Sequence, residues 1–265
     1  MHSTPRNTIE FRVWGRFAMF TDPLTRVGGE KCSYHVPTYE ALKGIAKSIY
    51  WRPTLIWVID AVRVMKRIRT QTKGTKPLNY GGIYRSERNP TKKKEEPFNT
   101  LAIYMFLTGD PDPVTALPGV EYQVTAHFEW NEHRPELAQD RVDGKHYQIA
   151  LRSLERGGRQ DIFLGTRDCQ GYVAPCEFGS GTGDYDGKGE LGFGLMFHSF
   201  DYPDETGVNA LRSNFWRPQM VDGVIRFPRP EECVVKKEIR EMLRKPFGLD
   251  KNLRRVNAEA QELEA

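Results

Sequence analysis

A lysine and a histidine stand side by side where a helix is expected to begin. Lys145 and His146 follow Gly144 and open a segment, 145–156, whose apolar residues recur with helical spacing, and Asp143 is a candidate N-cap. The free N–H groups of a helix N-terminus attract anions, a lysine adds positive charge, and histidine exchanges protons near neutral pH. The pair predicts a phosphate site beside a proton-transfer group. A solvated lysine next to a surface histidine would have the same sequence.

Tyr50 stands at the end of the apolar stripe of an earlier helix, which is predicted from Thr38 to about residue 50. Thr38 is a suitable N-cap, and Pro53 stops the helix within one turn. A tyrosine in this position either packs in the core or presents its hydroxyl group to a neighbouring site. The sequence leaves both readings of Tyr50 open.

Motifs for nucleotide or metal chemistry lack the context that they need. Residues 187–192 match G-x-G-x-x-G, but a dinucleotide site needs a strand before this motif and a helix after it. Here a glycine-rich loop precedes the motif and a strand-like segment follows. Cys169 and Cys176 are seven residues apart and His127 and His133 are six apart, which is not the spacing of common zinc motifs. We therefore expect no metal site and no cofactor.

The composition is that of a folded globular chain in a reducing compartment. Of 265 residues, 38% are apolar and 28% are charged, and the net charge is +4. No apolar run approaches the roughly 18 residues that a membrane span needs, and the first residues lack the apolar core of a secretory signal. Four cysteines are too few for a disulfide framework in a chain of this length. We expect a cytoplasmic protein without a membrane partner.

Positive charge is concentrated in residues 63–94, which contain eleven Lys or Arg residues and one acidic residue. Such a local excess is typical of a protein that binds a polyanion, although a solvated loop is the alternative. The candidate phosphate contacts lie on the basic end of a predicted strand and on its extension: Arg63, Lys66, Arg67, Lys73 and Lys76. Duplex DNA is a further candidate partner, because phosphate contacts do not read sequence.

The order of predicted elements indicates a fold. Apolar patterns predict strands over 9–19, 55–68, 101–107, 122–130 and from 162, with helices over 38–50 and 145–156. Without residues 70–119, this order is strand, helix, strand, strand, helix, strand, which is the ferredoxin-like βαββαβ arrangement shared with RNA-recognition folds. We expect an α+β fold with a ferredoxin-like domain over 1–168, carrying a hairpin insertion at about 70–119.

The last third of the chain differs in composition and in the pattern of its apolar residues. Residues 179–194 contain seven glycines, and Asp222–Gly223 stands between two apolar runs, which predicts a two-residue hairpin. We expect a small antiparallel β domain with a glycine-rich loop over 169–233. A charged tail, helical in composition, is predicted over 234–265.

Five stretches of the sequence resemble a known protein family. They are 20–23 (FTDP), 28–53 (GGEKCSYHVPTYEALKGIAKSIYWRP), 144–147 (GKHY), 157–179 (GGRQDIFLGTRDCQGYVAPCEFG) and 202–205 (YPDE). The chain is similar to the type I-C CRISPR precursor-RNA processing endoribonucleases, the Dvulg branch of the Cas-five family in the RAMP superfamily. Residues 85–97 and 108–119 look like added length relative to that pattern.

The resemblance implies a function and a site. It implies a metal-independent endoribonuclease that cuts CRISPR repeat transcripts near the base of the repeat hairpin, then stays on the 5′ tag of the crRNA as a subunit of the type I-C interference complex. By motif, Tyr50 corresponds to the tyrosine of SIYW, and Lys145 and His146 to the lysine and histidine of GKHY. The alternative is a non-catalytic crRNA-binding structural subunit, as many members of the wider family are.

Metal-free cleavage of RNA uses the 2′-OH of the substrate as the nucleophile. Its attack on the adjacent phosphorus leaves a 2′,3′-cyclic phosphate and a 5′-OH, and it needs a base, an acid and positive charge on the phosphorane. We expect Lys145 to stabilise the phosphorane. Tyr50 and His146 would divide the base and acid roles in an order that the sequence leaves open.

Overall fold

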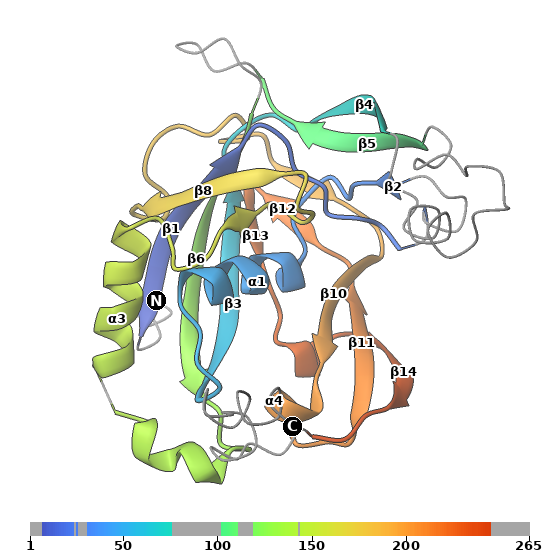
Figure 1. Ribbon diagram of the computed structural model, residues 1–265. Helices are drawn as coiled ribbons and strands as arrows, with labels where there is room; N and C mark the ends of the chain where they lie inside the picture. The colour runs from blue at the N-terminus through green and yellow to red at the C-terminus, as the bar shows by residue number, and fades with distance from the viewer. Residues whose placement is uncertain are drawn as a thin grey trace, which may run out of the picture.

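The computed structural model describes residues 7–23, 25, 31–75, 102–110, 119–142 and 144–244. The fold is mixed α+β, and its sheets are mostly antiparallel. Two helices of three turns each lie on one side of the main sheet and contact each other (Figure 1). The helical elements are α1 (Tyr39–Ile49), η2 (Pro135–Asp140), α3 (Lys145–Glu155), α4 (Pro203–Thr206) and η3 (Pro230–Glu232).

The main sheet has eight strands in the order β7-β8-β1-β6-β3-β13-β12-β9, and every neighbouring pair is antiparallel. Its strands are β1 (Thr8–Gly15), β3 (Leu55–Val64), β6 (Val120–Trp130), β7 (Ile162–Phe163), β8 (Gln170–Pro175), β9 (Glu190–Gly192), β12 (Gln219–Val221) and β13 (Val224–Arg226). The strand predicted over 122–130 is confirmed as β6, whereas the one predicted over 9–19 is present as β1 only as far as Gly15.

Two smaller sheets flank the main one (Figure 1). One is β10-β11-β14, formed by Met196–Asp201, Ala210–Trp216 and Val235–Glu241. The other is β2-β5-β4, formed by Lys31–Cys32, Ala102–Thr108 and Arg69–Thr75. The β4 and β5 strands pair antiparallel, as the predicted hairpin insertion requires, and residues 76–101 between them lie outside the described residues.

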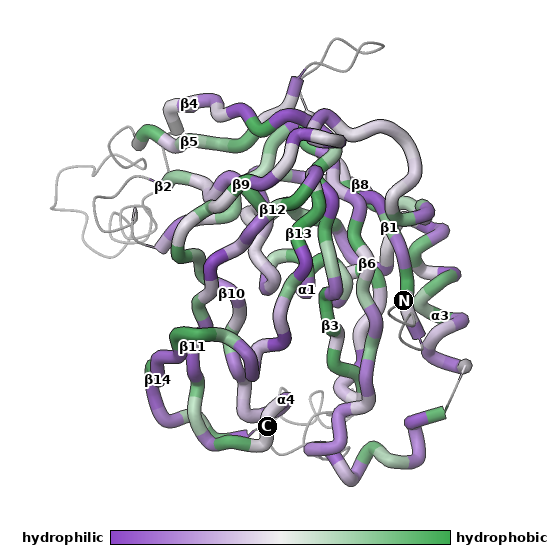
Figure 2. The backbone as a smooth tube through the Cα atoms, turned by 180° about the vertical axis from the view of Figure 1, so that it is seen from behind, coloured by the Kyte–Doolittle hydropathy of each residue, from purple (hydrophilic) through white to green (hydrophobic). Residues whose placement is uncertain are grey.

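The core lies between the main sheet and the two helices. Alternate residues of β1, namely Ile9, Phe11 and Val13, are buried there, and the apolar stripe of α1, which lies against β3, belongs to the same cluster. Figure 2 shows hydrophobic stretches along the central strands, whereas β4 and β14 are largely hydrophilic. The predicted helix start is also confirmed, because the Thr38 side chain accepts a hydrogen bond from the backbone N–H of Ala41.

The prediction of one long strand over 55–68 is wrong. The β3 strand ends at Val64, and the chain enters a different sheet at Arg69. Between them, the backbone N–H of Arg67 donates to the Asp184 carboxylate at 2.7 Å and that of Ile68 donates to the Tyr185 hydroxyl at 2.9 Å. Because these N–H groups bond to a distant loop, the strand cannot continue.

Two expectations for the last third of the chain also need correction. Residues 169–233 do not form a sheet of their own, because β8 pairs with β1 and the confirmed Asp222–Gly223 hairpin joins the main sheet through β13 and β3. The start of the predicted helical tail is a strand instead, since residues 235–241 form β14 along the free edge of β11. The edge of a sheet has unpaired backbone N–H and C=O groups, and a segment that bonds to them becomes a strand even when its composition favours a helix. Residues 245–265 lie outside the described residues.

A loop from the glycine-rich region covers part of the outer face of the main sheet, the face turned away from α1 and α3. Buried Arg63 on β3 donates to the carbonyl oxygens of Ser180 and Gly181 at 3.0 Å each and to the Asp186 carboxylate at 2.7 Å. Gln123, its neighbour on β6, donates from its amide nitrogen to the Ser180 carbonyl at 2.7 Å. The hydrogen bonds from Arg63 hold the pKa of the Asp186 carboxyl below its usual value. Arg63 therefore fastens the loop to the sheet.

This arrangement predicts that Arg63 is a stability residue. Replacing it by methionine (Arg63→Met) keeps most of the buried stem and removes the hydrogen bonds to the three partners in the loop that this side chain satisfies, Ser180, Gly181 and Asp186. We expect the free energy of unfolding, measured by urea titration, to fall by about 2–3 kcal/mol. The matched control is Arg67→Met, whose side chain is exposed, and it should change stability by less than about 0.5 kcal/mol. Equal stabilities of the two variants would contradict this role.

Candidate active site

The structure brings Tyr50, Lys145 and His146 together around Asp140. The Tyr50 hydroxyl oxygen lies 2.8 Å from Nδ1 of His146, and both residues are only 1% exposed. On the other side of the imidazole, Nε2 lies 2.6 Å from the backbone carbonyl oxygen of Asp140. Trp130 packs edge-on against the same ring, with 5.6 Å between the ring centroids. The imidazole is therefore fixed in orientation by contacts on several sides.

These contacts define the tautomer of His146. A carbonyl oxygen can only accept a hydrogen bond, so Nε2 carries the proton in the neutral ring. Nδ1 is then the acceptor, and the Tyr50 hydroxyl donates to it. The Asp140 carbonyl thus holds the imidazole with its basic nitrogen directed at the phenol, which is a geometry suited to proton transfer.

Lys145 is the exposed member of the group, and its partner is Asp140. Its Nζ lies 2.6 Å from Oδ1 of Asp140, and the side chain is 48% exposed. The other carboxylate oxygen accepts a hydrogen bond from the Thr54 hydroxyl at 2.9 Å. The hydrogen bond from Lys145, joined by the one from Thr54, lowers the pKa of the Asp140 carboxyl against the opposing effect of burial. Asp140 is therefore a carboxylate that occupies the anion position next to Lys145.

Each site residue is placed by the end of an element. Tyr50 is the C-cap of α1, and its carbonyl oxygen accepts a hydrogen bond from the Trp57 indole at 2.7 Å. Lys145 and His146 open α3, whose N-cap is Gly144 with a positive φ of 76° and no side-chain capping bond. The predicted cap, Asp143, lies outside the described residues. Asp140 ends η2 in the connection between β6 and α3.

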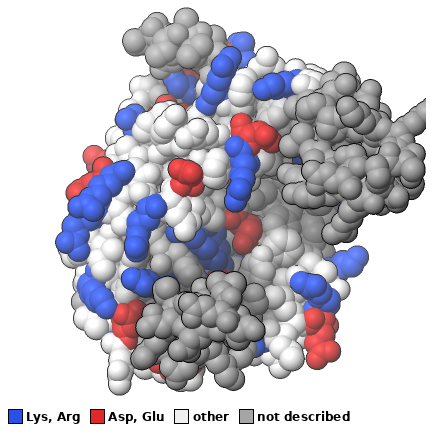
Figure 3. Space-filling view, viewed as in Figure 1, with Lys and Arg blue, Asp and Glu red and all other residues white. Residues whose placement is uncertain are grey.

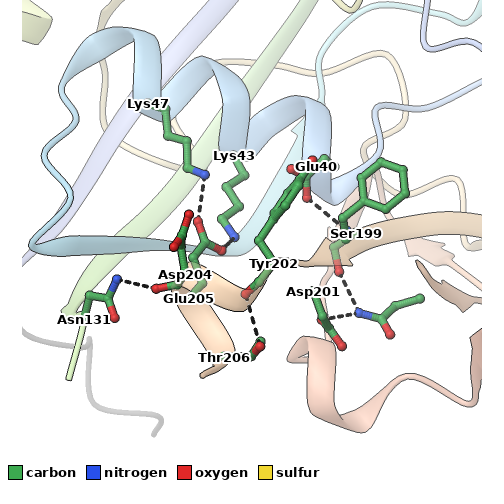
Figure 4. Close-up of polar contacts among 12 residues, drawn as sticks. Glu40, Lys43, Lys47, Asn131, Ser199, Asp201, Tyr202, Asp204, Glu205 and Thr206 are labelled. Carbon is green, nitrogen blue, oxygen red and sulfur yellow. Dashed lines mark hydrogen bonds and ion pairs between the residues drawn. The ribbon is translucent and has the colours of Figure 1, made fainter. Parts of the chain in front are cut away.

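The short helix α4 bonds to α1 on one side and to the segment after β6 on the other (Figure 4). Glu205 is bonded to two lysines of α1, to Lys43 and, at 2.8 Å, to Lys47. Next to it, the backbone carbonyl of Asp204 accepts from the Asn131 amide at 2.8 Å, and its carboxylate pairs with Arg134 at 2.5 Å. The YPDE motif therefore fixes α1, which carries Tyr50, relative to the segment that leads into η2 and Asp140.

The predicted RNA-binding residues are scattered rather than gathered at this site. Arg67 and Lys73 are exposed, Lys66 is half-buried, and Lys76 lies outside the described residues. Arg63 is buried, and its donors are directed to the glycine-rich loop, so its contact with RNA stays a prediction without structural support. In Figure 3, Lys and Arg side chains gather over the side of the molecule that α3 covers. The exposed basic residues on and after α3 are Lys145, Arg152, Arg156 and Arg159.

Within the described ranges, no three His, Cys, Asp or Glu side chains are grouped as a metal ion would require. Among the same residues, none of the helices combines the length and the apolar character needed to cross a bilayer.

Comparison with known proteins identifies the family. A family model described as CRISPR-associated protein (Cas_Cas5), named Cas_Cas5d, matches residues 8–228. The chain belongs to the Cas5d family. Among its relatives is the CRISPR pre-crRNA endoribonuclease Cas5d of Mannheimia succiniciproducens, 27% identical over 230 residues, which are 84% of this chain and 95% of the relative. Cas5d of Thermus thermophilus is 33% identical over 58 residues, which are 22% of this chain and 24% of that protein.

Solved structures agree with this membership. A CRISPR-associated protein aligns with a TM-score of 0.65 and 31% identity, covering 87% of this chain and 96% of the other. A functionally uncharacterized protein from Streptococcus mutans aligns with the same TM-score and coverages at 35% identity. The resemblance drawn from the five stretches is thus confirmed at the level of the Cas5d family.

Sequence reasoning missed two residues at this candidate site. Asp140 contacts both Lys145 and His146, and the Arg159 guanidinium lies 5.7 Å from the centroid of the Tyr50 ring. Asp140 lies five residues before Lys145 in a segment without apolar periodicity, so no spacing rule points to it. Arg159 belongs to the GGRQD stretch that carries the resemblance, and this is the one signal in the sequence that could have drawn attention to it.

The lowered pKa of Asp140 has a consequence for stability. Because the pKa of this carboxyl is lower in the folded than in the unfolded protein, its ionised form stabilises the fold at pH values above the unfolded pKa, near 3.9. This stabilisation is lost as the pH falls through the folded-state pKa. We therefore expect wild type to be more stable than Asp140→Asn at pH 7, and the difference to shrink below about pH 4. Thermal melts of both proteins between pH 3 and 7 measure this. A difference that persists unchanged at pH 3 would contradict it.

Proposed function

We propose that this Cas5d protein is a metal-independent endoribonuclease that cuts CRISPR repeat transcripts near the base of the repeat hairpin. The observation that carries the proposal is the hydrogen bond between the Tyr50 hydroxyl and Nδ1 of His146, with Lys145 beside it. The relatives in Mannheimia and Thermus named as pre-crRNA endoribonucleases support RNA as the substrate. After cleavage, the protein stays on the 5′ tag of the crRNA as a subunit of the type I-C interference complex, in the cytoplasm.

The cleavage is a transesterification within the RNA. The 2′-oxygen forms a bond to phosphorus, the bond from phosphorus to the 5′-oxygen breaks, and the 2′ proton goes to a base while an acid protonates the leaving oxygen. The Tyr50–His146 hydrogen bond supports a relay in which the phenol oxygen takes the 2′ proton as its own proton passes to Nδ1. In reverse, the same relay returns the proton from Nδ1 through the phenol oxygen to the leaving 5′-oxygen, so the pair supplies both the base and the acid. Lys145 stabilises the charge on the phosphorane.

RNA can reach this relay only after a local rearrangement. Tyr50 and His146 are buried, and Asp140 covers them from the η2 segment. Lys145 is exposed and holds a carboxylate in the position where a phosphate would bind. In the proposed mechanism, the scissile phosphate replaces the Asp140 carboxylate on Lys145, and the movement of that side chain opens the site to the ribose while the Asp140 backbone carbonyl still holds the imidazole.

The proposal includes a ferredoxin-like core. The strand order β8-β1-β6-β3, with α1 after β1 and α3 after β6, supports that arrangement. In RNA-recognition folds the sheet face opposite the helices binds bases. Here the loop held by Arg63 and Gln123 covers much of that face, so we infer that RNA is bound mainly at the helix side and along the edges of the sheet.

Single substitutions at the three predicted catalytic residues test the site. Tyr50→Phe, Lys145→Ala and His146→Ala should each slow cleavage of a cognate repeat RNA by about 10²–10⁴-fold, because each removes a proton-transfer or charge-stabilising group. The assay uses end-labelled RNA in excess EDTA, and the terminal groups of the products are mapped. Lys237→Ala removes an exposed lysine from β14, which lies in a different sheet; it is the matched control and should cut at the wild-type rate.

The outcome also separates the proposal from its alternative. One cut that leaves a 2′,3′-cyclic phosphate and survives EDTA supports the metal-independent nuclease. Tight binding without any cut by wild type would instead support a non-catalytic crRNA-binding structural subunit. Cleavage at the wild-type rate by all three variants would show that the site lies elsewhere.

Phosphate contacts should dominate the affinity for RNA. We expect the binding constant to fall steeply with salt, since each neutralised phosphate releases counterions. Lys73→Ala, which removes an exposed charge from β4, should reduce the slope of the logarithm of the binding constant against the logarithm of salt by about 1. Filter binding between 50 and about 300 mM salt measures the slope. Parallel titrations with duplex DNA test that further partner, and a salt-independent affinity would exclude phosphate-led binding.

A further inference from the structure

A hollow of about 570 Å³ lies next to the candidate site and has no part in the proposed cleavage step. It opens between the turn that follows α3 and the edge of β8, which lie side by side in Figure 1. Its volume is within the range of small-molecule sites, about 300–1,000 Å³. Its lining includes Gly158, Arg159, Gln160, Asp161, Gln170 and Tyr172, and we call it the Tyr172 hollow.

Tyr172, one of the lining residues, carries an exposed aromatic ring. Tyr172 on β8 is 54% exposed, although a ring of this size is usually covered. It pairs across the strands with Trp14 on β1, at 6.0 Å between ring centroids. The other neighbour of Trp14 is Arg12, whose guanidinium carbon lies 4.5 Å from the indole centroid. Arg12, Trp14 and Tyr172 thus form a ledge of flat groups that ends at the hollow.

The other lining residues offer the polar groups that a nucleotide needs. Arg159 supplies a cation for a phosphate, and the side-chain amides of Gln160 and Gln170 both donate and accept, as the edges of bases require. The Asp161 carboxylate accepts from base amino groups or from a ribose hydroxyl. A flat ring, one cation and several amides are the groups with which proteins hold unpaired nucleotides.

The hollow is connected to the candidate active site through Arg159. The backbone N–H groups of Arg159 and Gln160 both donate to the carbonyl of Ser48 at 3.1 Å, which fixes this turn to the last turn of α1. The Arg159 guanidinium reaches from there to 5.7 Å from the centroid of the Tyr50 ring. One side chain therefore borders both the hollow and Tyr50, so a nucleotide in the hollow would be close to the nucleotide at the site.

We propose that the Tyr172 hollow binds an unpaired nucleotide that flanks the repeat hairpin, with its base stacked on Tyr172 and its phosphate on Arg159. This rests on the proposed function, because it names where the flank of the same RNA is bound. The occupant is single-stranded, since bases in a duplex are stacked on one another and cannot cover a protein ring. The hollow acts in positioning: it sets which phosphate of the strand arrives at Lys145.

The test compares two RNA probes on three variants. One probe is the cognate repeat hairpin with its natural single-stranded flanks, and the other is the same hairpin without flanks. Both carry 2′-deoxyriboses on the 3′ side of the stem so that they are not cut there. Tyr172→Leu keeps apolar volume without a flat ring, and Tyr172→Phe keeps the ring. Leu191→Ala removes an exposed apolar side chain from β9, at the opposite edge of the main sheet, and is the matched control.

We expect Tyr172→Leu to bind the flanked probe about 10-fold more weakly than wild type does, as the loss of one stacked base predicts. Its affinity for the hairpin without flanks should be unchanged, and Tyr172→Phe and Leu191→Ala should bind both probes like wild type. In a second measurement, 4-thiouridine in the flank should crosslink to residues 157–175 of wild type. Equal affinities of wild type and Tyr172→Leu for the flanked probe, or crosslinks elsewhere only, would overturn the inference.

The two proposals fail in distinguishable ways. If wild type cuts repeat RNA in EDTA while Tyr172→Leu binds both probes normally, only the inference about the hollow is wrong. If wild type binds neither probe and cuts nothing, the proposed function is wrong and the inference falls with it.

Discussion

The arrangement of the candidate site depends on the ion pairs that Glu205 makes with Lys43 and Lys47. The three charged groups lie between α1 and α4, and burial there raises the pKa of the Glu205 carboxyl less than the two lysines lower it. Charges taken out of water must be paired, so this contact admits few alternative positions of α1. Since α1 ends at Tyr50, a shift of the helix would move the phenol away from His146. The YPDE segment thus has a positional role without touching the site.

On the outer face of the main sheet, one buried charge determines where the glycine-rich loop lies. Arg63 stands at the centre of a face that would otherwise be open, and it can be buried there only because Asp186 and two carbonyl groups satisfy it. The positive φ values of Gly179 and Gly181 let the loop backbone lie this close to the sheet. The glycine-rich segment therefore serves as a cover, and the exposed aromatic ring of Tyr172 stands beyond its reach at the β8 edge.

The sequence predicted what is encoded locally. The Thr38 cap, the stripe of α1, the alternation in β1 and β6 and the Asp222–Gly223 hairpin depend on neighbours within a few residues, and all four are present. The failures concern pairings between distant residues. The end of β3 is set by loop residues 117 positions away along the chain. The carboxylate that pairs with Arg63 belongs to Asp186, which is 123 positions away. No periodicity in either segment carries that information.

The candidate site itself followed the same division. Motifs indicated Tyr50, Lys145 and His146, and the structure brings them together, but Asp140 came from an unpatterned connection between β6 and α3. The burial of Tyr50 and His146 was equally invisible, because exposure depends on which segment covers a side chain. Helix position alone placed His146 at a surface-accessible first turn, whereas η2 closes over it.

Asp140 also makes the protein its own competitor for the position beside Lys145. A group tethered by a few residues acts at an effective concentration of about millimolar or more. A small anion or a weakly bound nucleic-acid strand displaces the Asp140 carboxylate only when its own concentration exceeds that effective concentration. A long RNA that is bound at several other points brings its phosphate to Lys145 at a comparable effective concentration. Selectivity then arises from the number of simultaneous attachments, without any contact that reads a base. In the proposed mechanism, the Asp140 carboxylate therefore sets a threshold that short or unstructured polyanions do not pass.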